Sequence, residues 1–313
     1  MKTILVTGGC GYIGSVAVKK LLDKEYNVIV IDNLSNGYKK LLDKRAKPYF
    51  IDLCNKNKLN KIFKKHKFDS VMHFAAYKSV GESMQNTEKY SENIKGSINL
   101  LDCMVKHNVK EIIFSSSAAV YGSPKVDKVN EETETNPINY YGFTKLKIEE
   151  IIKWYSKINK ITYVIFRYFN VCGDMLGYVE KSPENIFPII MDVVRGKREK
   201  LVIFGNDYDT RDGTCIRDYI DVRDLVNAHI LALEKDVKNE IINLGSSSGY
   251  SVKELVDEFL KITNKLTYEI GKRRKGDPKK LISSNKKAKK LLNWYPKKNL
   301  KEMIESTYDA YSV

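Results

Sequence analysis

Two adjacent tyrosines stand just before a lysine in the stretch "INYYGFTKLKIEE", residues 138–150. Tyr141 lies four residues before Lys145, so the two side chains share one face if the segment is helical. Tyr140 lies five residues before the lysine and points elsewhere. A phenol with a pKa near 10 is ionised in only about one part in a thousand at neutral pH. Because a nearby ammonium lowers that pKa, the spacing indicates a tyrosine that could act as a general base.

The helix that would hold this pair is expected to start at Pro137, after Asn136 or Thr135 as the N-cap residue. The residues that share the helical face of Tyr141 are Lys145, Ile148, Ile152 and Tyr155. This stripe is typical of a core-facing helix except for the lysine. A lone lysine on an apolar stripe commonly snorkels to the surface, whereas one that stays buried indicates a functional site. Tyr140 is expected to pack at the entry of the helix.

A glycine triplet, Gly8, Gly11 and Gly14, lies in "TGGCGYIGS" between the first apolar run and the first helical pattern. Glycine permits the tight turn and lets backbone N–H groups approach a pyrophosphate at a helix N-terminus. Asp32 ends the second apolar run 18 residues after Gly14, where a ribose-binding acid is expected. An acid at this position favours NAD over NADP, because it repels a 2′-phosphate. Strand, turn, helix and acid together predict a dinucleotide site.

A run of hydroxyl side chains, "SSSAAVYG" at residues 115–122, follows another buried β run. Hydroxyl groups at the C-terminal end of a parallel strand face the ligand crevice of an α/β sheet. A serine cluster alone is more often turn chemistry than catalysis. The predicted nucleotide site upstream and the Tyr141–Lys145 pair favour the functional interpretation.

The elements that must position these residues alternate between short β runs and helical patterns, which predicts a parallel sheet. The β runs are "KTILVT", "NVIVID", "PYFID", "SVMHFAA", "EIIFSSS" and "TYVIFRYFN". After Asn170 the pattern changes to loops rich in Gly, Asp and Asn, with helical segments among them. We therefore predict an α/β fold, a Rossmann-type doubly wound parallel sheet with a smaller α/β C-terminal lobe.

The domain boundaries follow from the same change of pattern. The chain of 313 residues exceeds the usual size of one domain. We expect a dinucleotide-binding domain at residues 1–170, with residues 219–244 returning to it, and a substrate domain at residues 171–313.

The net charge of +15 could indicate a nucleic-acid partner, but the composition argues against one. Of the 54 basic residues only nine are arginines, and the lysines are spread along the chain. A protein that reads nucleic acid more often has clustered arginines and interleaved aromatic residues. The basic segment 272–292 is expected to be a solvated face and a basic helix. A positive surface would still attract a small anionic substrate.

The spacing of the cysteines, histidines and apolar residues indicates the cellular compartment and whether a metal or a membrane is involved. The five cysteines are widely spaced, which predicts free thiols in a reducing cytosol. The four histidines are scattered singly, so we expect no metal site. No apolar run approaches the roughly 20 residues of a membrane span, and the N-terminus lacks the pattern of a signal peptide. We predict a cytoplasmic protein without a membrane or nucleic-acid partner.

Taken together, these motifs closely resemble the extended short-chain dehydrogenase/reductase family, and within it the sugar-nucleotide epimerases. The resemblance extends nearly from end to end. Besides the glycine, serine and tyrosine–lysine motifs, the segments that fit the pattern are "IDNLSNG", "HFAAYKSVGES", "RYFNVCG", "FGNDYDTRDGTCIRDYIDV", "INLGSSSGYSV" and "RRKGDP".

The resemblance implies roles for individual residues. Tyr141 would be the catalytic base, Lys145 its partner and Ser117 the hydroxyl that contacts O4 of the sugar. The implied NAD-binding residues are Gly8, Gly11, Tyr12, Ile13, Gly14, Asp32, Asn33, Asp52, Leu53, Phe74, Ala75, Lys78, Asn93, Tyr141, Lys145 and Phe169. The implied substrate-binding residues are Ser117, Tyr141, Asn170, Asn185, Arg217, Arg274 and Asp277, and Phe169 also matches a sugar-nucleotide contact.

The reaction implied by the resemblance interconverts UDP-glucose and UDP-galactose with bound NAD. Hydride leaves C4 of the sugar, a 4-keto sugar turns about its link to the diphosphate, and hydride returns to the opposite face. The family also implies a homodimer formed through the helices near residues 86–107 and 141–158.

Other activities stay open. An N-acetylhexosamine or a uronate could replace the hexose, since Leu281 stands where the family varies a residue that limits room for an N-acetyl group. A 4,6-dehydratase or a decarboxylase would need extra acids beside the strand-end hydroxyl, where Ala118 and Ala119 stand. A non-enzymatic NAD-binding regulator would be expected to lack Tyr141 or Lys145. The interpretation as a nucleic-acid-binding module is supported by the net charge alone.

Overall fold

The computed structural model describes residues 1–179, 184–274 and 278–312. The chain forms two compact units. The first unit comprises residues 1–122, 137–167 and 226–242, and the second unit comprises residues 123–136, 168–225 and 243–313. Each unit is made of three separate segments of the chain, so the chain passes from one unit to the other several times.

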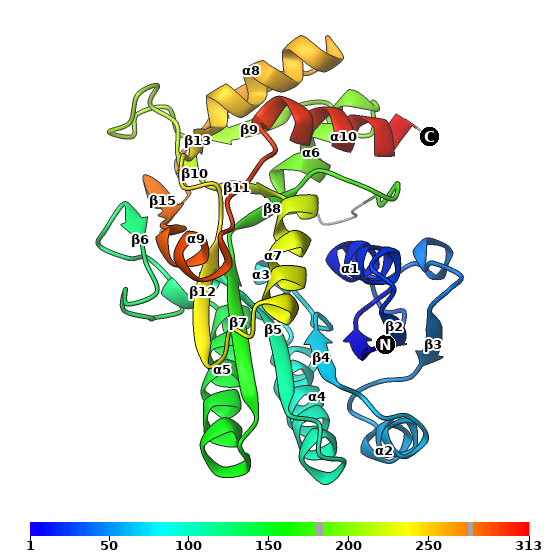
Figure 1. The fold of residues 1–313 in the computed structure, drawn as a ribbon. Helices are drawn as coiled ribbons and strands as arrows, with labels where there is room; N and C mark the ends of the chain where they lie inside the picture. The colour runs from blue at the N-terminus through cyan, green and yellow to red at the C-terminus, as the bar shows by residue number, and fades with distance from the viewer. Residues whose placement is uncertain (180–183, 275–277, 313) are drawn as a thin grey trace. The chain divides into compact units, whose positions relative to one another are not determined.

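A seven-stranded sheet with the order β12-β7-β5-β4-β1-β2-β3 forms the centre of the first unit (Figure 1). Its strands are β1 (Thr3–Thr7), β2 (Asn27–Asp32), β3 (Lys47–Phe50), β4 (Ser70–His73), β5 (Glu111–Ser117), β7 (Thr162–Tyr168) and β12 (Glu240–Leu244). β1 pairs in parallel with β2 and β4, β2 with β3, and β4 with β5. The strand order reverses direction at β1, which confirms the predicted doubly wound, Rossmann-type sheet.

Helices cover the sheet because its strands are apolar on both faces. The helices and 3₁₀ turns are α1 (Tyr12–Asp23), η1 (Lys39–Leu41), α2 (Lys56–Lys65), α3 (Val80–Ser83), α4 (Thr87–Lys106), η2 (Ala118–Tyr121), α5 (Tyr140–Asn159) and α7 (Val222–Glu234). Leu5, Ile29 and Ile31 form one core with side chains of α2, α4 and α5. Ile4 and Val6 are equally buried, and since side chains alternate along a strand they line the opposite face.

The start of α5 differs from the prediction. The helix begins at Tyr140, and Asn139 is its N-cap, with its side-chain oxygen accepting a hydrogen bond from the Gly142 N–H at 2.8 Å. The predicted start at Pro137, capped by Asn136 or Thr135, is therefore wrong. Asn139 has an extended backbone and satisfies an N–H group of the first turn, so this side-chain cap fixes the helix start three residues after Pro137.

The described residues of the second unit form three smaller sheets and four helices. The sheets have the orders β13-β10-β15-β6, β11-β8 and β14-β9. The strands are β6 (Lys128–Val129), β8 (Asn170–Cys172), β9 (Leu201–Phe204), β10 (Ile216–Arg217), β11 (Tyr219–Asp221), β13 (Tyr250–Ser251), β14 (Tyr268–Gly271) and β15 (Lys280–Ser283). The helices are α6 (Ile186–Val194), α8 (Val252–Thr263), α9 (Lys286–Leu292) and α10 (Leu300–Ser312). Phe187, Phe259 and Met303 lie in the core shared by α6, α8 and α10.

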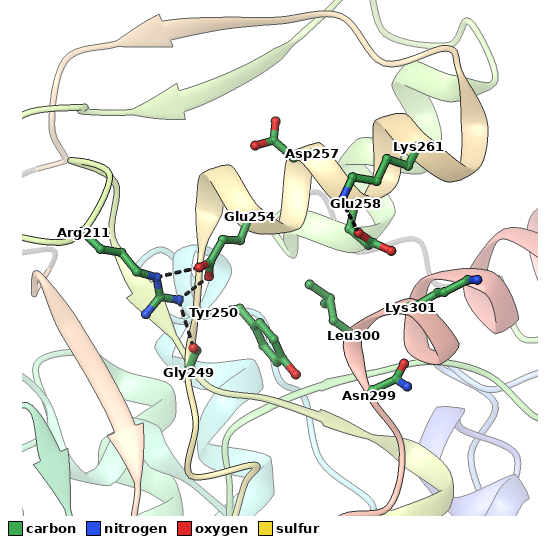
Figure 2. A pocket seen from close by; sticks show the side chains of 10 residues that line it. All are labelled: Arg211, Gly249, Tyr250, Glu254, Asp257, Glu258, Lys261, Asn299, Leu300 and Lys301. Atoms are coloured by element: carbon green, nitrogen blue, oxygen red, sulfur yellow. Dashed lines mark hydrogen bonds and ion pairs between the residues drawn. The ribbon is translucent and has the colours of Figure 1, made fainter.

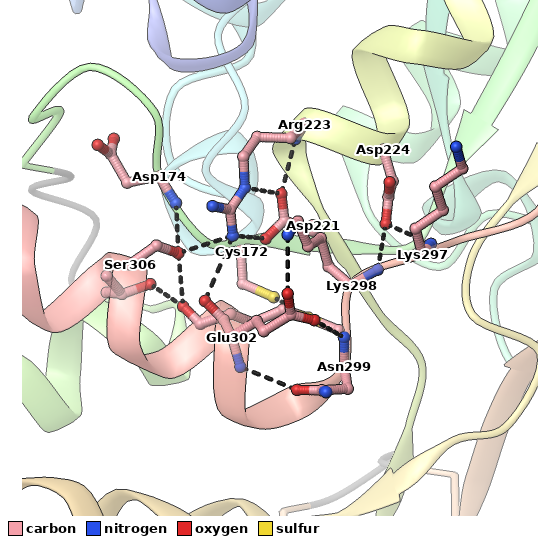
Figure 3. Close-up of polar contacts among 12 residues, drawn as sticks. Cys172, Asp174, Asp221, Arg223, Asp224, Lys297, Lys298, Asn299, Glu302 and Ser306 are labelled. Atoms are coloured by element: carbon pink, nitrogen blue, oxygen red, sulfur yellow. Dashed lines mark hydrogen bonds and ion pairs between the residues drawn. The ribbon is translucent and has the colours of Figure 1, made fainter.

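Charged and polar groups tie α10 to the middle of the second unit (Figure 3). The Arg223 guanidinium donates two hydrogen bonds to the Asp221 carboxylate, at 2.8 and 2.7 Å, and others to Ser306 Oγ and the Glu302 carbonyl. Asp224 accepts hydrogen bonds from two consecutive backbone N–H groups, at positions 297 and 298, each at 2.7 Å. The segment entering α10 is therefore held by carboxylates at the β11–α7 junction.

Two compositional predictions can be compared with the structure. All five cysteines are free thiols, as predicted. Within the described ranges, none of the helices combines the length and apolar character that a bilayer crossing demands.

The Asp218 carboxylate connects three segments of the second unit. It is fully buried and accepts five hydrogen bonds. The donors are Ser246 N and Oγ, Ser247 N, and Ser283 N and Oγ, at 2.6 to 3.1 Å. A carboxylate can stay buried here because the donors saturate its oxygens.

We expect Asp218→Asn to lower the free energy of unfolding by about 2–3 kcal/mol, because the amide NH2 would face hydrogen-bond donors. Urea denaturation would measure the loss. Asp209→Asn is the matched control, since the Asp209 side chain is 93% exposed and pairs with exposed Lys279; its effect should stay within a few tenths of a kcal/mol. Equal effects of the two changes would contradict this role of Asp218.

Candidate active site

The turn between β1 and α1 brings the three predicted glycines together. Gly8 has φ +73°, and a Cβ atom at Gly14 would lie 2.1 Å from the Gly8 carbonyl oxygen. The Gly11 N–H donates to the same oxygen at 3.0 Å. Gly11 precedes the first helical residues, Tyr12 and Ile13, and has no side chain to cap them. The N-terminus of α1 is thus open to an anion, as a pyrophosphate site requires.

Asp32, the last residue of β2, is fixed beside this turn. Its carboxylate accepts hydrogen bonds from the Cys10 N–H at 2.9 Å and the Leu34 N–H at 2.7 Å. Burial raises the pKa of Asp32, and the two backbone hydrogen bonds oppose that rise. An acid at the end of the second strand, in contact with the glycine turn, is the arrangement that binds a dinucleotide ribose.

Asn33, Asp52 and Leu53 form a second group at the ends of β2 and β3. The Asn33 side-chain amide donates to the Asp52 carboxylate at 2.8 Å. Burial favours a higher pKa for Asp52, but hydrogen bonds from Asn33 and Cys54 lower it overall. Leu53 packs so closely against α4 that a Cβ atom at Gly96 would lie 3.0 Å from its own Cβ.

Phe74 and Ala75 follow β4 and remain attached to β1. The Phe74 N–H donates to the Thr7 carbonyl at 3.1 Å, and the Ala75 N–H lies 3.4 Å from Thr7 Oγ1. A Cβ atom at Gly8 would lie 2.7 Å from the Ala75 nitrogen. The predicted Phe74–Ala75 segment therefore touches the glycine turn directly.

Lys78 and Asn93 complete the predicted cofactor group of the first unit. The Lys78 ammonium lies 5.9 Å from the ring centroid of Tyr12. Asn93, on α4, accepts a hydrogen bond from the Tyr77 N–H and donates one to the Tyr77 carbonyl, at 2.9 and 3.0 Å. Asn93 thus fixes the loop that contains Lys78.

Ser117, Tyr141 and Lys145 also come together in the first unit. Ser117 ends β5, and its hydroxyl lies near the phenol of half-buried Tyr141 and acts to lower the pKa of that phenol. Lys145 is only 2% exposed. Its ammonium donates to the Ser115 carbonyl at 2.6 Å and lies 5.9 Å from the Tyr141 ring centroid. Lys145 therefore does not snorkel, and it shares a face with Tyr141 as predicted.

Burial dominates the electrostatics of this group. It raises the pKa of the Tyr141 phenol, and the hydrogen bond with Ser117 opposes the rise. Burial lowers the pKa of Lys145 to about 7, and the negative charge of Glu149 opposes that fall. A phenol and an amine with shifted pKa values at a strand end are suited to proton transfer near neutral pH.

Glu149 and Arg167 form a buried ion pair in the first unit that was not predicted from the sequence. The Arg167 guanidinium donates to the Glu149 carboxylate at 3.0 and 2.7 Å. Glu149 also accepts a hydrogen bond from Ser116 Oγ at 2.5 Å. The sequence does contain one signal for Glu149: it follows Lys145 by four residues, so the two side chains share one face of the helix.

Tyr140 has a different environment from Tyr141. Its hydroxyl lies 2.7 Å from Ser91 Oγ, and its ring stacks on Phe143 with 5.6 Å between centroids. The prediction that Tyr140 packs at the helix entry is confirmed.

The described substrate-binding candidates outside the Ser117–Tyr141 group lie in the second unit. Asn170 donates to the Asp218 carbonyl through its backbone N–H and its side-chain amide, at 3.1 and 2.8 Å. Arg217 precedes Asp218 on β10. Asn185 is the N-cap residue of α6. The Arg274 guanidinium lies 4.0 Å from the Phe204 ring centroid. Phe169 is buried and donates its N–H to the Leu244 carbonyl. Asp277 lies outside the described residues.

A surface pocket of about 530 Å³ lies between α8 and the start of α10 in the second unit (Figure 2). Its charged lining residues bond to the protein itself: the Arg211 guanidinium donates to Glu254 at 2.6 Å and to the Gly249 carbonyl at 3.2 Å. None of the predicted site residues that the structure describes lines it. We therefore assign no catalytic role to this pocket.

Comparison with known proteins places the chain in a family. Residues 4–245 match the model of the NAD dependent epimerase/dehydratase family. The match spans most of the chain and includes the glycine turn, Asp32 and the Ser117–Tyr141–Lys145 group. The chain belongs to this family.

Individual relatives within the family are similar along the whole chain. The UDP-glucose 4-epimerase of Halalkalibacterium halodurans is 45% identical, with 98% of this chain and 94% of the relative covered. The UDP-glucose 4-epimerase from Brucella ovis, solved in complex with NAD, has a TM-score of 0.95 at 34% identity, with coverage of 99% and 98%. The Bifidobacterium longum enzyme, in complex with NAD+ and UDP, has a TM-score of 0.91 at 36% identity, with the same coverage.

We expect Gly14→Ala to weaken NAD binding by about 10-fold or more, because an added methyl group would collide with the Gly8 carbonyl and open the turn. Isothermal titration of the cofactor-stripped protein with NAD would measure the change. Ser15→Ala is the control, since it removes a hydrogen bond to the Tyr12 carbonyl but adds no atom to the turn. Unchanged NAD affinity in Gly14→Ala would contradict the assignment of the turn.

Proposed function

We propose that the chain is an NAD-dependent epimerase that interconverts UDP-glucose and UDP-galactose. The observation that carries the proposal is the group of Ser117, Tyr141 and Lys145, with a buried lysine held against the strand that presents the serine. The full-length similarity to UDP-glucose 4-epimerases supports it.

The residues of the first unit fit NAD. The open N-terminus of α1 would hold the pyrophosphate, and Asp32 would accept hydrogen bonds from a ribose. NAD, when bound, supplies the acceptor for hydride from C4 of the sugar and the donor that returns it. The other NAD contacts are assigned to the residues predicted from the sequence, most of which lie around the glycine turn and the ends of β2, β3 and β4.

Proton transfer is assigned to the protein's own groups. Tyr141 takes the proton of the 4-hydroxyl group and later gives it back to O4. Ser117 holds O4 by a hydrogen bond, and the Lys145 ammonium stabilises the Tyr141 phenolate. The same tyrosine can serve both faces of the sugar because the proton always goes to and from O4.

The second unit is assigned the sugar nucleotide. Asn170, Asn185, Arg217, Arg274 and Asp277 are the proposed contacts. A guanidinium presents two N–H groups to a phosphate in one plane, so the two arginines suit a diphosphate. A firmly held UDP leaves the sugar free to turn while its link stays fixed. In domain terms, residues 1–170 and 219–244 would bind NAD, and residues 171–313 the substrate.

The alternatives differ in substrate and in reaction. UDP-N-acetylhexosamine and UDP-uronate would use the same proton transfer at O4. A 4,6-dehydratase needs an acid beside the strand-end hydroxyl, and η2 presents Ala118 and Ala119 there, which disfavours it.

A homodimer in the cytoplasm is the proposed state of the protein. Met84, Phe143, Trp154 and Ile158, on or next to α3 and α5, are 38 to 69% exposed, which is an apolar surface suited to a second copy. Free thiols suit a reducing compartment.

The test of the proposed function is conversion of UDP-glucose and of UDP-galactose by the purified protein without added cofactor. We expect both directions to reach the same equilibrium mixture, read from the anomeric protons by NMR. UDP-GlcNAc, UDP-GalNAc and UDP-glucuronate in parallel would establish the substrate. A protein that converts none of the five is not an epimerase of these sugar nucleotides.

Tyr141→Phe should keep its bound NAD and lower kcat by about 10²–10⁴-fold, because the change removes the acid–base group alone. Initial rates and NAD content after denaturation would measure both properties. Tyr140→Phe is the matched control: it removes the contact with Ser91, and its kcat should stay near that of the wild type. Near-normal turnover in Tyr141→Phe would place the base elsewhere.

A further inference from the structure

Behind Tyr141 and Lys145 lies a buried ionic cluster that the proposed proton transfer does not use. Glu149, one helical turn after Lys145 on α5, is 0% exposed, and Arg167 on β7 is 3% exposed. Burial of an unpaired charge is strongly unfavourable, so each of these groups needs a partner.

The Glu149 carboxylate is held firmly in position. Arg167 donates to both of its oxygens, and Ser116 Oγ donates to one of them. Arg167 is held in turn by Tyr121, whose hydroxyl accepts from Nη1 at 3.0 Å and whose ring centroid lies 4.9 Å from the guanidinium carbon. The negative charge therefore has a fixed position relative to α5 and β5.

The charges of the cluster limit where a proton can be lost. With Tyr141 neutral, Lys145, Glu149 and Arg167 sum to one positive charge, and loss of one proton makes the cluster neutral. That proton can come from Tyr141 or from Lys145. The two products contain the same number of protons, so pH cannot choose between them, and the local charges decide.

We propose that Glu149, held by Arg167, is the counter-charge that favours retention of the shared proton on Lys145 and thereby favours ionisation of Tyr141. Glu149 is a positioning residue, because it acts through Lys145 and contacts no reacting atom. The inference rests on the proposed epimerase function and explains how its base is formed.

The other groups near Lys145 agree with this role. On β4, burial lowers the pKa of His73 to about 3, and its ring nitrogens contact Thr7 Oγ1 and Ser97 Oγ at 2.7 and 2.9 Å, so His73 is neutral. Among the described residues of the first unit, the other charged or titratable groups near Lys145 are Tyr141 and Glu149 on α5, Tyr121 on η2 and Arg167 on β7. Of these, Glu149 is the acid that raises the pKa of Lys145 against the effect of burial.

The test is Glu149→Gln in the NAD-loaded protein. Without the negative charge, the protonated pair is disfavoured, so the acid limb of the kcat–pH profile should move about one unit lower. The remaining proton shifts from Lys145 to Tyr141, so the plateau kcat should fall about 10–100-fold with KM changed less than threefold. Glu149→Asp, which keeps the charge, should recover part of the lost kcat.

Two further variants exclude a purely structural role. Asp221→Asn removes an equally buried carboxylate from a bidentate arginine pair in the second unit and should leave the acid limb unmoved. Glu149→Leu combined with Arg167→Met replaces the ion pair by apolar groups, which commonly preserves folding; its kcat should still be low. Full activity in this double variant, or an unmoved acid limb in Glu149→Gln, would overturn the proposal.

A direct titration separates the inference from the proposed function. The ultraviolet difference spectrum between each protein and its Tyr141→Phe derivative reports phenolate at position 141 without turnover. We expect the Tyr141 phenolate to form at higher pH in Glu149→Gln than in the wild type. Phenolate formation at the same pH in both proteins would overturn the role of Glu149, even if epimerisation is observed. If the wild type converts no sugar nucleotide but the two proteins differ in phenolate formation, the role of Glu149 stands and the epimerase function is rejected.

Discussion

The Lys145 side chain is buried, and several elements of the first unit hold its amino group in place. The Ser115 carbonyl of β5 accepts its hydrogen bond, the Phe114 and Tyr141 rings lie 4.9 and 5.9 Å away, and Glu149 supplies the negative charge. Since a hydrogen bond of 2.6 Å tolerates little displacement, α5 must pack on β5 in one register. The packing that buries Ile148 and Ile152 therefore also sets the chemistry of Tyr141.

The glycine turn imposes a similar constraint on the other side of β4. Gly8 touches Ala75, and Gly14 touches the Gly8 carbonyl, at distances that leave no room for a side chain. Close approach of β1, α1 and the segment after β4 is thus built into the backbone. The parallel order of the sheet brings the ends of these strands to one edge, which is where cofactor chemistry and proton transfer have to meet.

The sequence was sufficient to predict features that depend on local spacing. The β runs, the glycine turn with Asp32, and the common face of Tyr141 and Lys145 were all predictable from period and offset. The start of α5 was not, because Pro137 and Asn139 both give valid start signals and only the side-chain cap of Asn139 forms. The Glu149–Arg167 pair was missed for a different reason: the two residues are 18 positions apart and become partners only when β7 lies next to β5 in the sheet.

Glu149 and Asp218 are both buried carboxylates, but their hydrogen-bond partners give them different roles. Asp218 accepts five hydrogen bonds from serine hydroxyl and backbone N–H groups. Its charge is therefore compensated by these neighbours, and the carboxylate holds their segments in position. The proposed substrate residues Asn170 and Arg217 are attached to it through the Asp218 carbonyl and the adjoining peptide bond. Glu149 is instead bonded to one cation and acts on another, so part of its charge remains available to Lys145. Saturation with neutral donors makes a carboxylate structural, whereas sharing it between two cations lets it control where a proton resides.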